Sequence, residues 1–88
     1  YKDKEIDLIG LNEKENKAFF VECKYKKNVN PIKILNNLSD KAGFFEWKNK
    51  SRQESYIIFA KSFKKKVKSF KGKRVFCFDF KDLSKKLR

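Results

Sequence analysis

Asp7, Glu22 and Lys24 are the residues of this chain whose types and spacing could perform chemistry. Glu22 and Lys24 stand two positions apart in the run 17–26, KAFFVECKYK, where apolar and polar side chains alternate as in a strand. Side chains two positions apart share one face of a strand, so both charges accompany Phe20. A charge on a buried strand face needs a partner, because its desolvation costs free energy.

The element that must position these charges is a β-hairpin. Residues 5–11 form a second alternating run, and the polar segment 12–16 separates it from the first. Two alternating runs joined by a turn-like segment are typical of a hairpin. With the turn centred in that segment, the register places Asp7 directly opposite Glu22.

Two opposed carboxylates repel each other, and a divalent cation between them would remove the repulsion. Hard cations take oxygen ligands and are commonly held by one or two carboxylates, with waters and a phosphate completing the shell. We therefore expect Asp7, Glu22 and the backbone carbonyl of Cys23 to hold Mg²⁺ or Mn²⁺. Lys24 would then lie beside the metal-bound water that attacks a phosphodiester. Glu5 is a further candidate acid.

These residues resemble the signature of the PD-(D/E)XK nuclease superfamily. Glu-Ile-Asp at 5–7 is followed by Phe-Val-Glu-Cys-Lys at 20–24, an acid on one hairpin strand and Glu-x-Lys on the next. The sequence pattern EIDLIGLN…FFVECKYK more specifically resembles the C-terminal domain of a group of archaeal P-loop ATPases, and the similarity is highest over residues 4–27. The resemblance implies a restriction-endonuclease-like fold, metal-dependent hydrolysis of DNA, and an ATPase domain of the same longer protein as a partner.

The charge of the chain points to a polyanionic partner. Net charge is +13, from 24 basic against 11 acidic residues, and nearly all the basic residues are Lys. Lysines attract phosphates without reading bases, so we expect contact with a nucleic-acid backbone, DNA in preference to RNA. The candidate contact residues lie in three segments: Lys26, Lys27, Lys33, Lys41, Lys64, Lys65, Lys66 and Lys68.

Further along the chain, helical and extended patterns alternate. After the hairpin, the patterns predict a helix from Asn30 and Pro31 to about Trp47, with Gly43 as a residue that can kink or shorten it. They then predict a strand over 55–60, a short helix capped by Ser62, a strand over 74–78, and a final helix capped by Asp79. Strands separated by helices favour an α/β fold with a mixed central sheet flanked by helices.

Chain length and composition limit the number of domains and the classes of protein to which this chain can belong. An 88-residue chain is one small domain, and a chain without Met that opens almost on the first strand is expected to be a fragment, truncated at its N-terminus. It has no apolar run long enough for a membrane span and no His, and we expect a cytoplasmic location. Cys23 and Cys77 lie in apolar runs without metal-binding spacing, which indicates core residues.

Three other interpretations stay open. Glu22 and Lys24 could be an exposed ion pair of small energetic value. The domain could keep a nuclease fold only to bind DNA or a protein partner, because the acidic helix that family members usually place before the first strand is not among these residues. A small RNA-binding domain is the third, although no row of aromatic side chains for stacking bases is visible. Oligomeric state is undetermined by the sequence.

Overall fold

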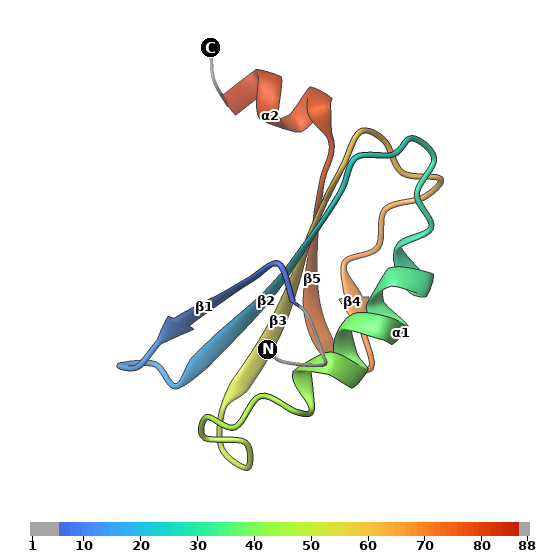
Figure 1. Cartoon of the computed structure of the whole chain (residues 1–88). Coiled ribbons are helices and arrows are strands. Elements are labelled where there is room, and N and C mark those ends of the chain that lie inside the picture. The colour runs from blue at the N-terminus through green and yellow to red at the C-terminus, as the bar shows by residue number, and fades with distance from the viewer. Residues whose placement is uncertain (1–5, 87–88) are drawn as a thin grey trace.

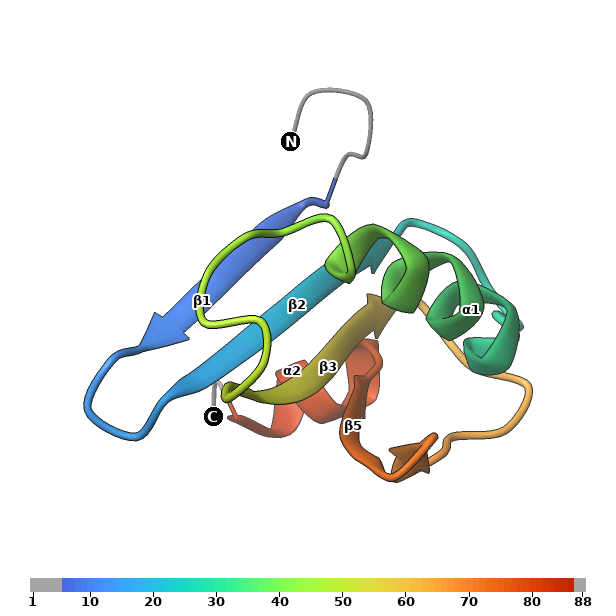
Figure 2. The same cartoon turned by 90° about the horizontal axis from the view of Figure 1, so that it is seen from below.

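In the computed structural model, which describes residues 6–86, five strands form one mixed sheet in the order β1-β2-β3-β5-β4 (Figures 1 and 2). The strands are β1 (Leu8–Asn12), β2 (Lys17–Lys24), β3 (Gln53–Ala60), β4 (Ser69–Phe70) and β5 (Lys73–Phe78). The central strands β2, β3 and β5 run parallel, while β1 and β4 pair antiparallel at the two edges. The predicted α/β class with a mixed sheet is confirmed.

The hairpin forms with the predicted register. Leu8 pairs with Val21 and Asn12 with Lys17 across β1 and β2, and the turn between them is closed by a 3.0 Å hydrogen bond that the Glu15 N–H donates to Asn12 Oδ1. β1 begins at Leu8, later than expected, so Asp7 lies in a bend just before it. Glu5 lies outside the described residues.

Helix α1 (Pro31–Ala42) begins where the sequence predicts. Asn30 caps it by accepting a 3.1 Å hydrogen bond from the Ile32 N–H, and Pro31 occupies the first turn, where its missing N–H costs nothing. The predicted end near Trp47 is wrong, and the helix stops at Ala42. A reason is visible in the structure: Arg52 donates a 2.9 Å hydrogen bond to the Ala42 carbonyl, which a longer helix would need for its own next turn.

The core lies between α1 and one face of the sheet (Figure 1). Its buried side chains come from β2, α1, β3 and β5: Ala18, Phe20, Leu35, Leu38, Ala42, Tyr56, Ile58 and Val75. Pro31, Leu35, Leu38 and Ala42 are the buried residues of α1, whereas Ile32 is 42% exposed. The alternation in β2 therefore places Glu22 on the covered face, next to Phe20.

The short helix predicted after Ser62 does not form. Residues 61–68 instead run beside the loop that joins β2 to α1, where Val29 donates to the Ser62 carbonyl and accepts from the Lys64 N–H, both at 3.0 Å. The Asn28 N–H also donates to Ser62 Oγ at 2.8 Å, so the predicted helix cap serves another segment. These hydrogen bonds pair backbone N–H and C=O groups that would otherwise be paired within a helix.

Helix α2 (Phe80–Lys86) follows β5 and lies at one end of the sheet, on the side opposite α1 (Figures 1 and 2). Asp79 is its cap, as predicted, and accepts a 2.9 Å hydrogen bond from the Asp82 N–H. The Asp82 carboxylate accepts in return from the Asp79 N–H at 2.9 Å and from Lys66 Nζ at 2.5 Å. Lys66, predicted to contact nucleic acid, is thus an anchor of α2.

Acid should loosen this anchor within a defined range of pH. The hydrogen bond from Lys66, followed by that from the Asp79 N–H, lowers the pKa of Asp82 from 3.8 to about 2. A depressed carboxyl pKa stabilises the fold above the ordinary value and ceases to do so as pH falls through the lowered one. We expect stability to decline between pH 3.8 and about 2, and Asp82→Asn to flatten that part of the profile. Thermal unfolding against pH measures this, with Asp40→Asn on exposed α1 surface as the control; equal profiles for the two variants would contradict it.

Candidate active site

Glu22 is the centre of the candidate site. It is only 7% exposed, because α1 covers this face of the sheet and Ile58 of β3 pairs beside it. Two lysines from different elements flank its carboxylate: Lys24 Nζ is 3.4 Å from Oε2, and Lys41 Nζ, from the last turn of α1, is 3.9 Å from Oε1. Because Glu22 is buried, the interpretation of an exposed Glu22–Lys24 pair on a solvated strand face is wrong.

One oxygen of the Glu22 carboxylate can still accept a hydrogen bond or bind a cation. Glu22 Oε1 is inaccessible to solvent and accepts no hydrogen bond from any of the described residues. The Lys41 ammonium, 3.9 Å from this oxygen, is too distant for a hydrogen bond. A buried acceptor left in this state carries a desolvation cost that a bound cation would relieve.

Asp7 lies beside the same end of β2. Its Oδ2 accepts a 2.7 Å hydrogen bond from the Cys23 backbone N–H. Asp7 lies one residue before the first pair of the hairpin, Leu8 with Val21, and the same register continued by one residue would place it opposite Glu22. Burial raises the pKa of the Cys23 thiol, and the negative charges of Asp7 and Glu22 raise it further. Both carboxylates therefore act on the Cys23 position, Asp7 from the bend before β1 and Glu22 from β2.

Cys23 itself is exposed, so its predicted place in the core is wrong. Its side chain alternates with Glu22 and so lies on the face opposite α1, away from the main core. Cys77 is half-buried and packs against the core cluster. A sequence pattern alone does not tell which face of a strand a helix will cover.

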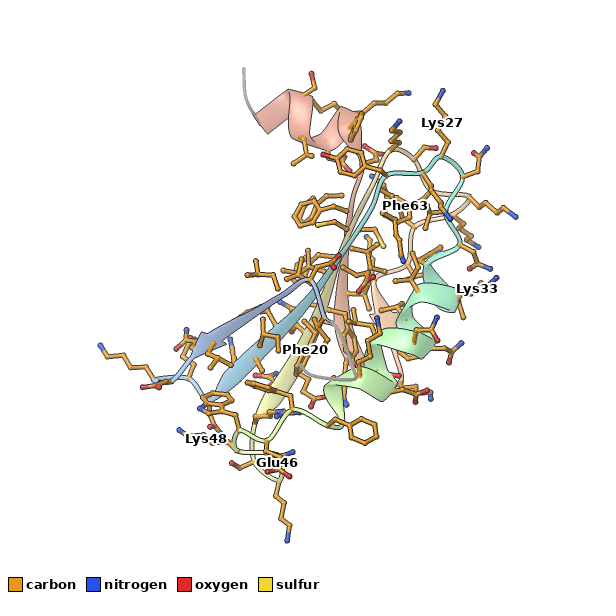
Figure 3. The ribbon with its side chains drawn as sticks, in the orientation of Figure 1. Phe20, Lys27, Lys33, Glu46, Lys48 and Phe63 are labelled. Carbon is orange, nitrogen blue, oxygen red and sulfur yellow. The ribbon has the colours of Figure 1, made fainter. Side chains whose placement is uncertain are left out.

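A cavity of about 280 Å³ opens beside Glu22 and is lined by the end of β2, the loop that follows it and α1. Five lysines line it, together with three asparagines: Lys24, Lys26, Lys27, Lys33, Lys41, Asn28, Asn30 and Asn37. Figure 3 shows Lys27 and Lys33 projecting outward near the N-terminal end of α1. The cavity therefore combines one buried carboxylate with a dense positive lining, a combination suited to a phosphate group.

The predicted basic residues divide into two groups. Four of them, Lys26, Lys27, Lys33 and Lys41, come together around this cavity. The other four, Lys64, Lys65, Lys66 and Lys68, lie on the segment between β3 and β4 and do not line it. Asn28 and Asn30 were not predicted as contact residues, whereas Lys33, Asn37 and Lys41 recur at spacing four, share one helix face and were possible phosphate contacts from the sequence.

The donor set fits a hard divalent cation held by few protein ligands. Within residues 6–86 no group of three or more acidic, Cys or His side chains gathers, and Glu22 is the one carboxylate among the described residues that line the cavity. Asp7 does not line the cavity; it is bonded to the neighbouring Cys23 N–H and would be the second ligand. Mg²⁺ is commonly bound through one or two carboxylates plus waters and substrate phosphate oxygens. The unpartnered Glu22 Oε1 and the lysine-lined cavity are consistent with that arrangement.

The described residues thus define a small α/β domain with a mixed sheet and a cationic cavity beside a buried carboxylate. Residues 1–58 match the model of a family described as archaeal and bacterial proteins of unknown function, DUF234, and the chain belongs to this family. The match covers the hairpin, α1 and most of β3, and with them every residue that lines the cavity. No curated protein and no solved structure matches the chain. Across residues 6–86, neither helix has the length and apolar character needed to cross a bilayer.

Proposed function

We propose that this domain is a metal-dependent nuclease of the PD-(D/E)XK type that hydrolyses phosphodiester bonds of DNA. The observation that carries the proposal is the buried Glu22 beside a lysine-lined cavity: its Oε1 accepts no hydrogen bond from the described residues, and Lys24 lies next to its other oxygen. The likeness of residues 4–27 to the C-terminal domain of archaeal P-loop ATPases supports a role accessory to an ATPase.

Each residue of the site would have a distinct task. Glu22 and Asp7 would hold Mg²⁺ or Mn²⁺, which supplies a nucleophilic water and stabilises charge on the phosphate. Asp7 Oδ2 already accepts from the Cys23 N–H, which fixes the carboxylate and leaves Oδ1 for the ion. Lys24 would stabilise negative charge that develops on the phosphate, and the other lysines of the cavity would bind flanking phosphates.

Cleavage by the wild-type chain tests the proposal directly. We expect plasmid and branched DNA to be cut in the presence of Mg²⁺ or Mn²⁺ and to remain intact with Ca²⁺ or with a chelator. The products should carry ends that result from hydrolysis. Absence of cutting with both metals, in protein that still binds the same DNA, would refute the nuclease activity.

A second function, DNA binding without cleavage, is favoured by the ion pairs at Glu22. Lys24 and Lys41 flank the carboxylate and balance its charge without a metal. The lysine-lined cavity would then bind the phosphate backbone alone. Salt-dependent DNA affinity combined with no metal-dependent cutting would identify this function.

Both functions require the cavity lysines to bind phosphates. The triple variant Lys26→Gln, Lys27→Gln, Lys33→Gln should weaken DNA binding by about 10²-fold near 0.1 M salt and reduce the slope of log affinity against log salt by about 2.7. Fluorescence anisotropy over a range of salt concentrations measures both quantities. These three residues leave the pairs at Glu22 intact.

The matched control removes the same charge from the segment between β3 and β4. Lys64→Gln, Lys65→Gln, Lys68→Gln keeps Lys66, which anchors α2, and should change the slope much less. Equal losses in the two triple variants would mean that binding follows net charge and that the cavity has no special role.

A further inference from the structure

Lys41 occupies a particular place in the candidate site. It comes from the last turn of α1, is 29% exposed, and its Nζ lies 3.9 Å from Glu22 Oε1, the carboxylate oxygen that accepts no hydrogen bond. Lys24 is close to the other oxygen, Oε2, at 3.4 Å. The side chain of Lys41 also lines the lysine-rich cavity. One ammonium group therefore adjoins both the free carboxylate oxygen and the space available to an anion.

This position creates a competition between cations. A divalent ion bound to Glu22 Oε1 would lie close to the Lys41 ammonium, and like charges at such a distance in a partly buried site repel strongly. The same ion would be favoured if Lys41 turned to another anionic partner. A phosphate in the cavity is such a partner, since the lining offers it five lysines and a single carboxylate.

We propose that the cavity binds a divalent cation and a phosphate group as a pair, and that Lys41 is the positioning residue that changes partner, from Glu22 to the phosphate, when the pair enters. The inference rests on the site of the proposed function. Its consequence is positive coupling: a nucleic-acid strand raises metal affinity, and the metal raises strand affinity by the same factor. When no nucleic acid is bound, the Lys41 ammonium group is the cation beside Glu22 Oε1 in place of the metal ion.

Mn²⁺ binding, measured by the electron paramagnetic resonance signal of free Mn²⁺, tests this without any activity readout. The probe for the strand is a short phosphorothioate oligonucleotide, which resists cleavage. We expect the oligonucleotide to raise the Mn²⁺ affinity of the wild-type chain about tenfold. Lys41→Gln should bind Mn²⁺ about tenfold more tightly than wild type without the oligonucleotide, and gain little when it is added.

Lys50→Gln is the matched control, because it removes the same charge from the exposed turn before β3, outside the cavity. It should behave as wild type in both titrations, and thermal melting verifies that the three proteins fold alike. If wild type binds Mn²⁺ and Lys41→Gln binds it equally or more weakly, the role of Lys41 is refuted while the metal site stands. If no variant binds Mn²⁺, with or without the oligonucleotide, the pairing and the metal-dependent nuclease are both refuted.

Discussion

Replacing Glu22 with Gln should slow metal-dependent DNA cleavage by about 10³-fold, because a metal ion contributes several kcal/mol of charge stabilisation to such a reaction. Gln preserves the volume of a side chain that is buried beside Phe20 and Ile58, so the fold should persist. DNA affinity should stay equal or rise, since the change removes a negative charge next to Lys24 and Lys41. Single-turnover cleavage and anisotropy measure the two effects separately.

Two comparisons make this prediction specific. Asp7→Asn should also abolish most cleavage, yet the amide oxygen retains an acceptor for the Cys23 N–H, which separates loss of charge from loss of the hydrogen bond. Glu13→Gln, in the exposed hairpin turn, removes the same charge far from the cavity and should leave cleavage unchanged. Wild-type cleavage rates in Glu22→Gln would exclude Glu22 as a metal ligand.

The second large effect concerns stability and centres on Arg52. Its side chain is only 2% exposed. It donates hydrogen bonds to three backbone carbonyls at and just beyond the C-terminal end of α1: Ala42 at 2.9 Å, Phe45 at 2.6 Å and Trp47 at 2.8 Å. It also donates to Glu54 Oε2 at 2.8 Å. Arg52 therefore joins the end of α1 to the start of β3, and with it the helix that covers the candidate site.

Arg52→Met should lower the free energy of unfolding by about 3–5 kcal/mol, because it removes hydrogen bonds to three carbonyls and one partner of a buried ion pair. Burial raises the pKa of Glu54, but hydrogen bonds from Lys73 and then Arg52 lower it overall, so the loss of Arg52 removes one of the two groups that keep this carboxylate charged. Urea denaturation measures the change. A domain of this size can unfold entirely under such a loss.

Lys73→Met is the natural control, since Lys73 donates to the same carboxylate at 2.6 Å but is 42% exposed. We expect it to cost only about 0–1 kcal/mol. Arg52→Lys, which keeps the charge without the planar fork, should fall between the two. Similar losses for Arg52→Met and Lys73→Met would show that the carbonyl contacts carry little energy.

Local sequence patterns were sufficient to predict the hairpin, the start of α1, and both ends of β5 to within one residue. Alternation of apolar and polar side chains determined the strands and the shared face of Phe20, Glu22 and Lys24, because strand geometry forces side chains two apart onto one side. Asn30 and Pro31 marked the helix start by local hydrogen bonding and a fixed dihedral angle. The hairpin register followed from a short turn, which leaves few alternatives.

Patterns failed where distant segments competed for backbone groups. The residues after Ser62 have helical spacing, but Val29 offers strand-like partners from across the chain, and the bridge forms instead. α1 ends early because Arg52, ten residues later, takes the Ala42 carbonyl. In both cases a long-range hydrogen bond overrode a local preference of small energy.

The candidate site shows the same division. The sequence by itself determined that Asp7, Glu22 and Lys24 belong to one hairpin, and that Lys33 and Lys41 share a helix face. Only the tertiary structure decided that α1 packs over Glu22, which brings Lys41 to within 3.9 Å of its Oε1 and gathers five lysines around one cavity. Period and spacing specify which residues share a face, whereas packing of one element on another decides which faces meet.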